Sequence, residues 1–391
     1  MSASAAERLD LFAVTAPGLE PLAEAELRAL GIDAAAEPGG VAWTGSPETL
    51  YAANLRLRTA SRVLVRLAEF PARAFYELER HARRIDWTRI VPAGAAVRVR
   101  VTSRKSRLYH QNAVAERILD AVERAVGAVA AAPAAAGAGD EDDDAGDAQL
   151  LVVRLVRDRC TISADTSGAL LHQRGYRQAV AKAPLRETLA AAMLLAGRWS
   201  GDEPLLDPLC GSGTIAIEAA LLARRIAPGL ARPGLEPRAY AFQRWPGFDE
   251  ARWRRVVEAA AREVRPAAGV DIVASDRDAG AIEAARANAE RAGVPGDVRL
   301  DVRALSAAEP PEGRGALVTN PPYGVRVGER AALRDLYAAL GRLARSRLPG
   351  WRIVMLSADR ALEGQVGVPF TEALRTRNGG IPVRVVVGEV R

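Results

Sequence analysis

Two kinds of hydrophobic pattern divide the chain. In the front half, segments with a period of two stand between helical segments. Residues Arg62 to Ala68 alternate apolar and charged side chains, and in Ala95 to Thr102 three valines alternate with Arg98 and Arg100. A period of two is typical of a half-buried strand. We therefore expect one face of the second strand to lie on a core and the other to present guanidinium groups.

The first 60 residues predict a small α/β unit. A strand is expected at Leu9 to Val14, a helix over Leu19 to Ala29 and another strand near Val41 to Trp43. The unit is too small to bury an adequate core of its own. It should therefore pack against the segments that follow, among which a helix is expected at Asn112 to Val126 and a strand at Leu150 to Val156.

From about Leu185 the pattern changes to helices that alternate with short apolar strands. This alternation indicates a parallel sheet covered on both faces. Near the end, two strand patterns flank Asn378-Gly379-Gly380, which is a hairpin signal and predicts an antiparallel edge. The expected strands are Pro204 to Leu206, Val270 to Ser275, Val298 to Asp301, Ala316 to Thr319, Arg352 to Ser357, Phe370 to Thr376 and Pro382 to Val390.

Residues 128–149 follow neither period. They consist mainly of Ala, Gly, Asp and Glu and contain no aromatic residue. Such a segment buries too little apolar surface to fold, so we expect a disordered insertion. Because a strand pattern resumes at Leu150, the insertion interrupts a domain rather than ending one. Its acidic run, Asp140 to Asp144, could mimic nucleic acid, but a solubilising role is the simpler interpretation.

Length and composition exclude several classes of protein. The 391 residues exceed what one core usually organises, so two or three domains are expected. No apolar stretch of about 20 residues occurs, and the start lacks a signal-peptide layout, so a cytoplasmic protein without membrane contact is expected. Two cysteines and three histidines are not spaced like metal ligands, so neither a disulfide scaffold nor a metal is expected.

Charge is unevenly distributed along the chain. Residues 1–50 carry 2 basic and 8 acidic groups, whereas residues 51–130 carry 16 basic and 7 acidic groups. A basic block of this kind suits contact with a polyanion. Arg-rich composition explains part of it, since only Lys105 and Lys182 are lysines. The RNA-binding candidates lie on the arginine-bearing strand and in the basic loop after it, although a solvated turn would look similar: Arg98, Arg100, Arg104, Lys105 and Arg107.

The first motif with chemical meaning is a glycine-rich turn between a strand and a helix. Such a turn lets a ligand approach the backbone closely, beside a helix N-terminus. Its third glycine position holds Ala216, so the dinucleotide fingerprint is met only in its Gly/Ala variant. Alone, this motif is weak evidence. Its candidate cofactor residues are Asp207, Pro208, Gly211 and Gly213.

Two further acids end the next strands. Asp276 stands 63 residues after Gly213, beyond an insertion at residues 226–265, and could bind ribose hydroxyls. Asp301 could bind the amino group of an adenine. Each acid alone is as well explained by a helix cap or a surface charge. Three acids at successive strand ends favour a nucleoside-containing cofactor.

The most specific motif is Asn320-Pro321-Pro322-Tyr323-Gly324, which follows the fourth strand of the parallel sheet. The Asn320 side-chain oxygen and the Pro321 carbonyl can accept both N–H bonds of a base amino group and direct its lone pair at a methyl donor. Tyr323 offers a surface for base stacking, worth roughly 1 to 3 kcal/mol. A plain strand-terminating turn is the alternative. Cys210 lies inside the glycine turn, so we assign it a packing role rather than a nucleophilic one.

At this point the sequence resembles the THUMP-domain guanine-N2 RNA methyltransferases. In some bacteria such enzymes form the first module of a fused protein, and the likeness is to that module. The order and spacing of the motifs match from about residue 165 to the end. The matching stretches are Leu171 to Arg177, Ala183 to Ala191, Leu206 to Ala220, Ala227 to Leu230 and Asn320 to Gly324.

The resemblance implies an α/β fold with a C-terminal Rossmann-like class I methyltransferase domain. It also implies S-adenosylmethionine as cofactor and structured RNA as partner, with 23S rRNA before tRNA. Thr188 joins the cofactor residues, and Asn320, Pro321 and Tyr323 become catalytic. The implied domains are a ferredoxin-like segment (1–60), a THUMP RNA-binding domain (61–165) containing the insertion 128–149, a linker (166–184) and the methyltransferase domain (185–391).

Other functions share the same motif. A DNA adenine-N6 methyltransferase, a tRNA guanine-N2 methyltransferase or a protein glutamine methyltransferase could each use the Asn320 turn, because it serves any planar amino or amide nitrogen. A ribosome-assembly protein that binds RNA and keeps a vestigial cofactor fold is the non-enzyme alternative. The basic front half argues against a protein substrate, and the intact motifs argue against the vestigial fold.

Overall fold

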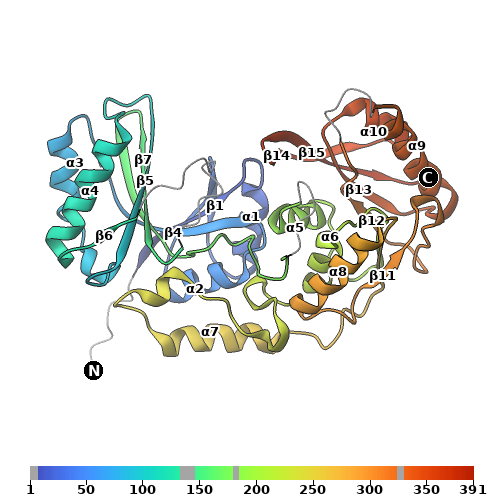
Figure 1. Ribbon diagram of the computed structural model, residues 1–391, viewed down its shortest axis with the longest axis horizontal. Helices are drawn as coiled ribbons and strands as arrows, with labels where there is room; N and C mark the ends of the chain where they lie inside the picture. Colours follow the sequence, from blue (N-terminus) through green and yellow to red (C-terminus); the bar gives the residue numbers. More distant parts are fainter. Residues whose placement is uncertain (1–7, 133–145, 179–184, 324–329) are drawn as a thin grey trace.

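The chain forms two α/β halves, each built around its own sheet (Figure 1). The structure is a computed structural model that describes residues 8–132, 146–178, 185–323 and 330–391. In the front half the sheet has the order β2-β3-β1-β4-β8-β7-β5-β6. In the rear half it has the order β11-β10-β9-β12-β13-β15-β14.

The front sheet runs without a break across the two domains expected there. Its central strand β4 (Ala60–Pro71) pairs with β1 on one side and β8 on the other, so the segment before residue 60 and the segment after it share one sheet. The remaining strands are β1 (Leu9–Thr15), β2 (Ala35–Glu37), β3 (Gly40–Gly45), β5 (Ala96–Arg104), β6 (Ala130–Ala131), β7 (Gln149–Val156) and β8 (Arg159–Asp165).

Helices cover one face of this sheet. In α4 (Gln111–Val126) the residues Val114, Ile118 and Val122 recur every four positions and are fully buried. Val97 and Val101 of β5 lie in the same core, whereas the arginines between the valines point to the other face, as the period of two predicts. The other helical elements of this half are α1 (Glu20–Ala29), α2 (Pro47–Arg56), α3 (Phe75–Ala82) and η1 (Trp87–Arg89).

The expected disordered insertion 128–149 is partly wrong. Its first residues form β6, which pairs in parallel with Ala96 and Val97, and Gln149 already belongs to β7. Backbone hydrogen bonding to the edge of the sheet compensates for the lack of apolar side chains in this short piece. Residues 133–145, with the acidic run Asp140 to Asp144, lie outside the described residues. Strand β8 had not been expected; Cys160 is buried within it.

The rear sheet places five parallel strands beside an antiparallel hairpin. All five expected parallel strands form, and β15 runs antiparallel to both β13 and β14, which confirms the hairpin. The strands are β9 (Leu205–Asp207), β10 (Ile272–Asp276), β11 (Arg299–Val302), β12 (Ala316–Thr319), β13 (Arg352–Ser357), β14 (Thr371–Asn378) and β15 (Ile381–Glu389).

Helices cover both faces of the rear sheet. Alternate residues of each strand belong to two cores, one on each face of the sheet. Val318 and Val354 pack with α5 (Glu187–Ala196) and α6 (Thr214–Ala223). Their neighbours Leu317 and Ile353 pack with α9 (Arg330–Arg347) and α10 (Arg360–Val366). Helix α8 (Ala279–Ala292) adds to the first layer. This doubly covered sheet is the Rossmann-like arrangement that the strand and helix pattern predicts.

The insertion between β9 and β10 connects the halves. It contains η2 (Pro228–Leu230), η3 (Pro233–Leu235), η4 (Ala241–Arg244) and α7 (Glu250–Arg262). Phe242 and Trp253 from this insertion pack on Tyr51 of α2, with ring centroids 4.7 and 5.8 Å away. The two halves therefore share one hydrophobic core.

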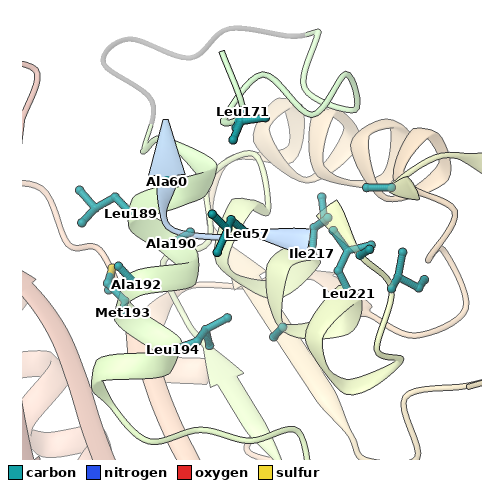
Figure 2. Packing of buried hydrophobic residues seen from close by; sticks show 14 of the residues in the cluster. Leu57, Ala60, Leu171, Leu189, Ala190, Ala192, Met193, Leu194, Ile217 and Leu221 are labelled. Atoms are coloured by element: carbon teal, nitrogen blue, oxygen red, sulfur yellow. The ribbon is translucent and has the colours of Figure 1, made fainter. Parts of the chain in front are cut away.

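The described part of the segment expected as a linker is packed between the halves. Leu171 lies with Leu57 and Ala60 against helices α5 and α6 (Figure 2). The buried Arg174 forms an ion pair with Glu218 of α6 at 2.7 Å and donates to the carbonyl of Arg58 at 2.7 Å. These contacts hold residues 166–178 in place; residues 179–184 lie outside the described ranges.

Candidate functional site

The glycine turn and the Asn320 turn lie side by side. Strands β9 and β12 are parallel neighbours, and each turn follows the carboxyl end of its strand. The Thr319 hydroxyl donates a hydrogen bond of 2.8 Å to Asp207 Oδ1, which connects the two strand ends directly. Strand order reverses between β9 and β12, the position where open α/β sheets bind ligands.

Two glycines shape the turn after β9 for different reasons. Gly213 has φ +83°, and a Cβ there would lie 2.9 Å from Ala285 of α8, so a side chain would push the two helices apart. Gly211 has φ +52°, and a Cβ there would meet no heavy atom within 4 Å. The space beside Gly211 is thus open to a ligand, while the space beside Gly213 is filled by protein.

Asp276 at the end of β10 supports the glycine turn. Its carboxylate accepts hydrogen bonds from the backbone N–H of Gly211 and of Asp278, both at 3.0 Å. It therefore fixes the conformation of the turn, and each carboxylate oxygen keeps a lone pair for a ligand. On the next strand, Asp301 lies level with Ser275, and the half-exposed Val302 lies level with Asp276. Arg299 and Arg303 stand 3.6 and 3.7 Å from the Asp301 carboxylate.

Asp207 is almost fully buried at the bottom of the site. Burial raises the pKa of its carboxyl to about 7. The hydrogen bonds from Thr319 and from the Leu209 N–H have the opposite, smaller effect. The negative charge of Asp276 raises the pKa further. A cationic ligand group beside Asp207 would relieve this cost of burial, so the site favours positive charge.

The Asn320 turn presents an unsatisfied acceptor. Oδ1 of Asn320 is buried and accepts no hydrogen bond from the described residues. An unpaired buried acceptor costs about 1–3 kcal/mol, and a ligand N–H would recover this cost. Pro321 is buried next to it, and the Tyr337 hydroxyl lies 3.5 Å from the Pro322 carbonyl. Gly324, the last residue of the motif, lies outside the described ranges.

Tyr323 is held by Asn378, a residue that the sequence pattern assigns only to a hairpin turn. Asn378, at the end of β14, donates from Nδ2 to the Tyr323 hydroxyl at 2.6 Å. Burial raises the pKa of that hydroxyl, and the hydrogen bond from Asn378 lowers it. The Asn-Gly-Gly signal predicted the hairpin, but nothing in the local pattern indicated a contact 55 residues away.

Thr188 lines a groove over the front sheet and lies in the same helical layer as α6. It belongs to the first turn of α5, which packs against α6, the helix that the glycine turn begins. Beside it, Glu187 forms an ion pair with Arg177 at 3.3 Å, and burial raises the pKa of Glu187 to about 7. Cys210 is buried in the turn, and burial raises the pKa of its thiol well above the usual value. That shift opposes thiolate formation and agrees with a packing role.

The predicted RNA-binding arginines are divided between two surfaces. Arg100 and Arg104 line a groove of about 820 Å³ on the face of the front sheet that carries no helix. Lys105, at φ +51°, and Arg107 belong to the turn after β5, where the Arg107 N–H bonds to Asp158 Oδ1 at 2.7 Å. Arg98 lies on the same strand but does not line the groove.

The described ranges contain neither a membrane-spanning helix nor a metal-binding cluster. No helix there is long and apolar enough to cross a membrane. Across the same residues, no three side chains of His, Cys, Asp or Glu are grouped so that they could hold a metal ion.

Comparisons with known proteins agree with this geometry. The family described as "RMKL-like, methyltransferase domain" matches residues 174–385, and "RlmL ferredoxin-like domain" matches residues 10–64. A putative RNA methyltransferase of Synechocystis sp. is 33% identical over 390 residues, which cover 100% of this chain and 99% of that protein. The ribosomal RNA large subunit methyltransferase K/L of Syntrophotalea carbinolica is 36% identical over 97% of this chain, which spans 53% of that protein.

A solved structure extends the likeness to three dimensions. The crystal structure of SMU.472, a putative methyltransferase complexed with SAH, superposes with a TM-score of 0.84 at 31% identity. The match covers 98% of this chain and 99% of that one. These matches agree with the doubly covered sheet and with the adjoining glycine and Asn320 turns. The chain belongs to the RMKL-like methyltransferase family, and its methyl donor is S-adenosylmethionine.

Proposed function

We propose that this protein methylates the exocyclic N2 amino group of a guanine in RNA, with 23S rRNA as the substrate. The observation that carries the proposal is the buried, unpaired Oδ1 of Asn320 beside the glycine turn. The names of two relatives, a putative RNA methyltransferase and a ribosomal RNA large subunit methyltransferase, support RNA as the substrate class. The arginine-rich front half supports a polyanionic substrate.

The residues around the glycine turn fit the cofactor. The open space at Gly211 admits a ligand against the backbone, and the buried Asp207 favours its positive charge. Asp276 and Asp301 offer carboxylates for ribose hydroxyls and the adenine amino group, and Val302 offers an apolar surface for the adenine ring. Pro208, Gly213 and Thr188 complete the proposed set through the shape of the turn and of α5. S-adenosylmethionine supplies an electrophilic methyl group on a sulfonium.

The Asn320 turn orients the nucleophile. An aryl amine has a lone pair that is delocalised into its ring, so the protein must rotate that lone pair toward the methyl group. Oδ1 of Asn320 and the carbonyl of Pro321 accept the two N–H bonds of the amine. Proline at positions 321 and 322 removes backbone donors and stiffens the loop, so the acceptors stay in place. Orientation rather than a strong base supplies the rate.

Tyr323 provides the surface for the target base. A base must leave its stack to reach a site between two strand ends, and an aromatic ring offers a stacking partner outside the RNA. The hydrogen bond from Asn378 fixes the position of the Tyr323 hydroxyl and therefore restricts the ring. Asn320, Pro321 and Tyr323 are thus proposed as the catalytic residues.

Nucleoside analysis tests the substrate. RNA and DNA from a strain that lacks the protein are digested and compared by mass spectrometry with the complemented strain. The proposal predicts loss of N2-methylguanosine from one position of 23S rRNA. Loss from tRNA would favour the tRNA enzyme, and loss of N6-methyladenine from DNA would favour the DNA enzyme. Unchanged nucleosides together with altered ribosome assembly would favour the vestigial RNA-binding protein.

A further inference from the structure

One cavity formed by the described residues carries a large excess of positive charge. It lies over the face of the front sheet opposite α1 to α4 and ends at β14 of the rear sheet, and we call it the arginine groove. Its lining contains eight arginines against two glutamates, a net charge of +6, equal to the net charge of the whole chain. The arginines are Arg62, Arg66, Arg100, Arg104, Arg154, Arg159, Arg186 and Arg377.

The regular order of the sheet positions these side chains. Alternate residues of β5, β7 and β8 face the groove, and the residues between them are buried against the helices. Residues two apart on one strand stand about 6.6–6.8 Å apart. In register, Arg104 lies level with Val156 and Arg159, and Arg154 lies level with Thr102 and Thr161. Guanidinium groups and hydroxyls therefore alternate across a rigid surface.

Not all of these cations are available to a ligand. Arg62 is buried and paired with Asp165 at 2.6 Å, Arg159 pairs with Glu69 at 2.9 Å, and Arg66 pairs with Glu37. Three exposed guanidinium groups make no hydrogen bond or ion pair with any other described residue: Arg104, Arg154 and Arg377. They come from β5, β7 and β14, so together they span both halves of the molecule.

The groove leads to the catalytic turn. Arg377 lines its rear end, and the next residue, Asn378, holds the Tyr323 hydroxyl. The two halves touch here: Gly18, at φ +90°, packs so closely that a Cβ would lie 1.9 Å from the carbonyl oxygen of Arg375. Figure 1 shows β14 reaching from the rear sheet toward the region of β1 and α5. The rear end of the groove and the contact to Tyr323 are thus carried by neighbouring residues of one strand.

We propose that the arginine groove binds a single-stranded segment of the RNA that flanks the target base. This inference rests on the proposed function and names the part of the substrate that the front half holds. A cavity of about 820 Å³ on a sheet face suits a flexible strand whose phosphates meet separate arginines. The nearly buried Phe12 ring supports the Arg66 guanidinium, which lies 4.4 Å from the ring centroid, so this cation is held at the floor of the groove. The rigid A-form surface of a duplex would meet such a concave face poorly.

Binding of a guanine-free probe tests the proposal. The probe is a uridine oligomer of about 12 nucleotides, within the usual site size for single strands. Its affinity for the full chain is measured by fluorescence anisotropy over a salt series. The test variant replaces Arg104, Arg154 and Arg377 with Ala. The control variant replaces Arg255, Arg262 and Arg342, which are exposed, lie outside the groove and remove the same charge.

In a plot of log affinity against log salt, the slope for the test variant should be smaller in magnitude by about 2. The reason is that three phosphate contacts to a single strand are lost. The control variant should keep the native slope, and Lys at the same three groove positions should restore it. Equal losses in both triple variants would overturn the proposal, because net charge alone would then explain binding. Tighter binding of a blunt RNA duplex, weakened by the same three substitutions, would also overturn it.

The outcome is independent of methyl transfer. If the Asn320→Ala enzyme retained full turnover, the proposed function would fail while the uridine result stood. If the groove variant bound the uridine oligomer normally, the groove assignment would fail while the catalytic turn stood.

Discussion

At the scale of single residues, the proposed cofactor site contains one buried carboxyl. Asp207 accepts a hydrogen bond from Thr319, and its pKa is raised to about 7 chiefly by burial. A carboxyl whose folded pKa exceeds its ordinary value of 3.8 is protonated more readily in the folded state. The free energy of unfolding therefore falls as pH rises from 3.8 through about 7.

Cofactor binding should show the opposite dependence on pH. In the proposed site the ionised Asp207 would attract the cationic methyl donor, whereas below pH 7 a proton would compete for the same carboxylate. We predict that affinity for S-adenosylmethionine, measured by isothermal titration calorimetry, rises by up to tenfold per unit of pH below about 7 and levels off above it. In Asp207→Asn the affinity should be lower and the dependence lost. Affinity of the native protein that is flat from roughly pH 5 to 8 would refute this role.

The two glycines of the turn offer a matched pair of substitutions. Gly211→Ala and Gly213→Ala share the cost of a positive φ, about 1–2 kcal/mol. Only Gly213→Ala also meets Ala285, so it should lower the free energy of unfolding further in urea titrations. Gly211→Ala should also reduce cofactor affinity, because its methyl group enters the open space assigned to the ligand. Equal losses of stability, with cofactor binding unaffected by Gly211→Ala, would contradict the open space assigned to the ligand.

At the scale of elements, the β14–β15 hairpin does more than close the sheet. It carries Arg377 into the groove and Asn378 to Tyr323, the proposed stacking residue. The edge strand β14 therefore contributes both to the arginine groove and to the proposed catalytic site.

A double-mutant cycle isolates the contact between hairpin and tyrosine. Asn378→Ala should lower kcat because the Tyr323 ring loses its restraint, by an amount that corresponds to one hydrogen bond, about 0.5–1.5 kcal/mol. In the Tyr323→Phe background the same substitution should have almost no further effect on kcat. Cofactor affinity serves as the control and should not change. Additive effects on kcat in the double variant would show that Asn378 acts by another route.

The elements were predictable to different degrees for physical reasons. The parallel strands of the rear half were found because each is buried on both faces and reads as a short apolar run. β8 was missed because its buried positions include the polar Ser163 and Asp165 beside Cys160 and Ile162, so it does not read as an apolar pattern, and a tight turn joins it to β7. The Asn320 motif is contiguous, so it could be recognised in the sequence. Its contact with Asn378 is non-local, so no sequence window could contain it.

At the scale of the whole molecule, buried polar contacts fix the two halves relative to each other. Arg174 lies between the Arg58 carbonyl of the front half and Glu218 of the rear half, and the Tyr176 hydroxyl donates to Glu218 at 2.9 Å. The resemblance implied that this segment is a linker. Its burial depends on contacts with both sheets, which a local pattern does not reveal. A groove that spans both halves requires such a fixed arrangement.

Loss of this ion pair should destabilise the whole protein. Arg174→Ala leaves Glu218 buried without its partner, and we predict that the free energy of unfolding falls by about 3–5 kcal/mol. Arg254→Ala is the control, because the pair of Arg254 with Glu250 is exposed and should contribute less than about 1 kcal/mol. Urea unfolding of both variants measures the difference. Similar small losses would mean that the buried pair does not hold the halves together.

Single-turnover methyl transfer by Asn320→Ala tests the central claim most directly. With the cofactor bound in advance and the natural RNA in excess, the rate constant for transfer should fall by on the order of 10²–10³, by analogy with the loss of one directed hydrogen-bonding group in other enzymes. Cofactor affinity should remain close to that of the native enzyme, since Asn320 orients the base. A native rate of transfer would show that the amine is oriented by other groups and that the clamp described here is wrong.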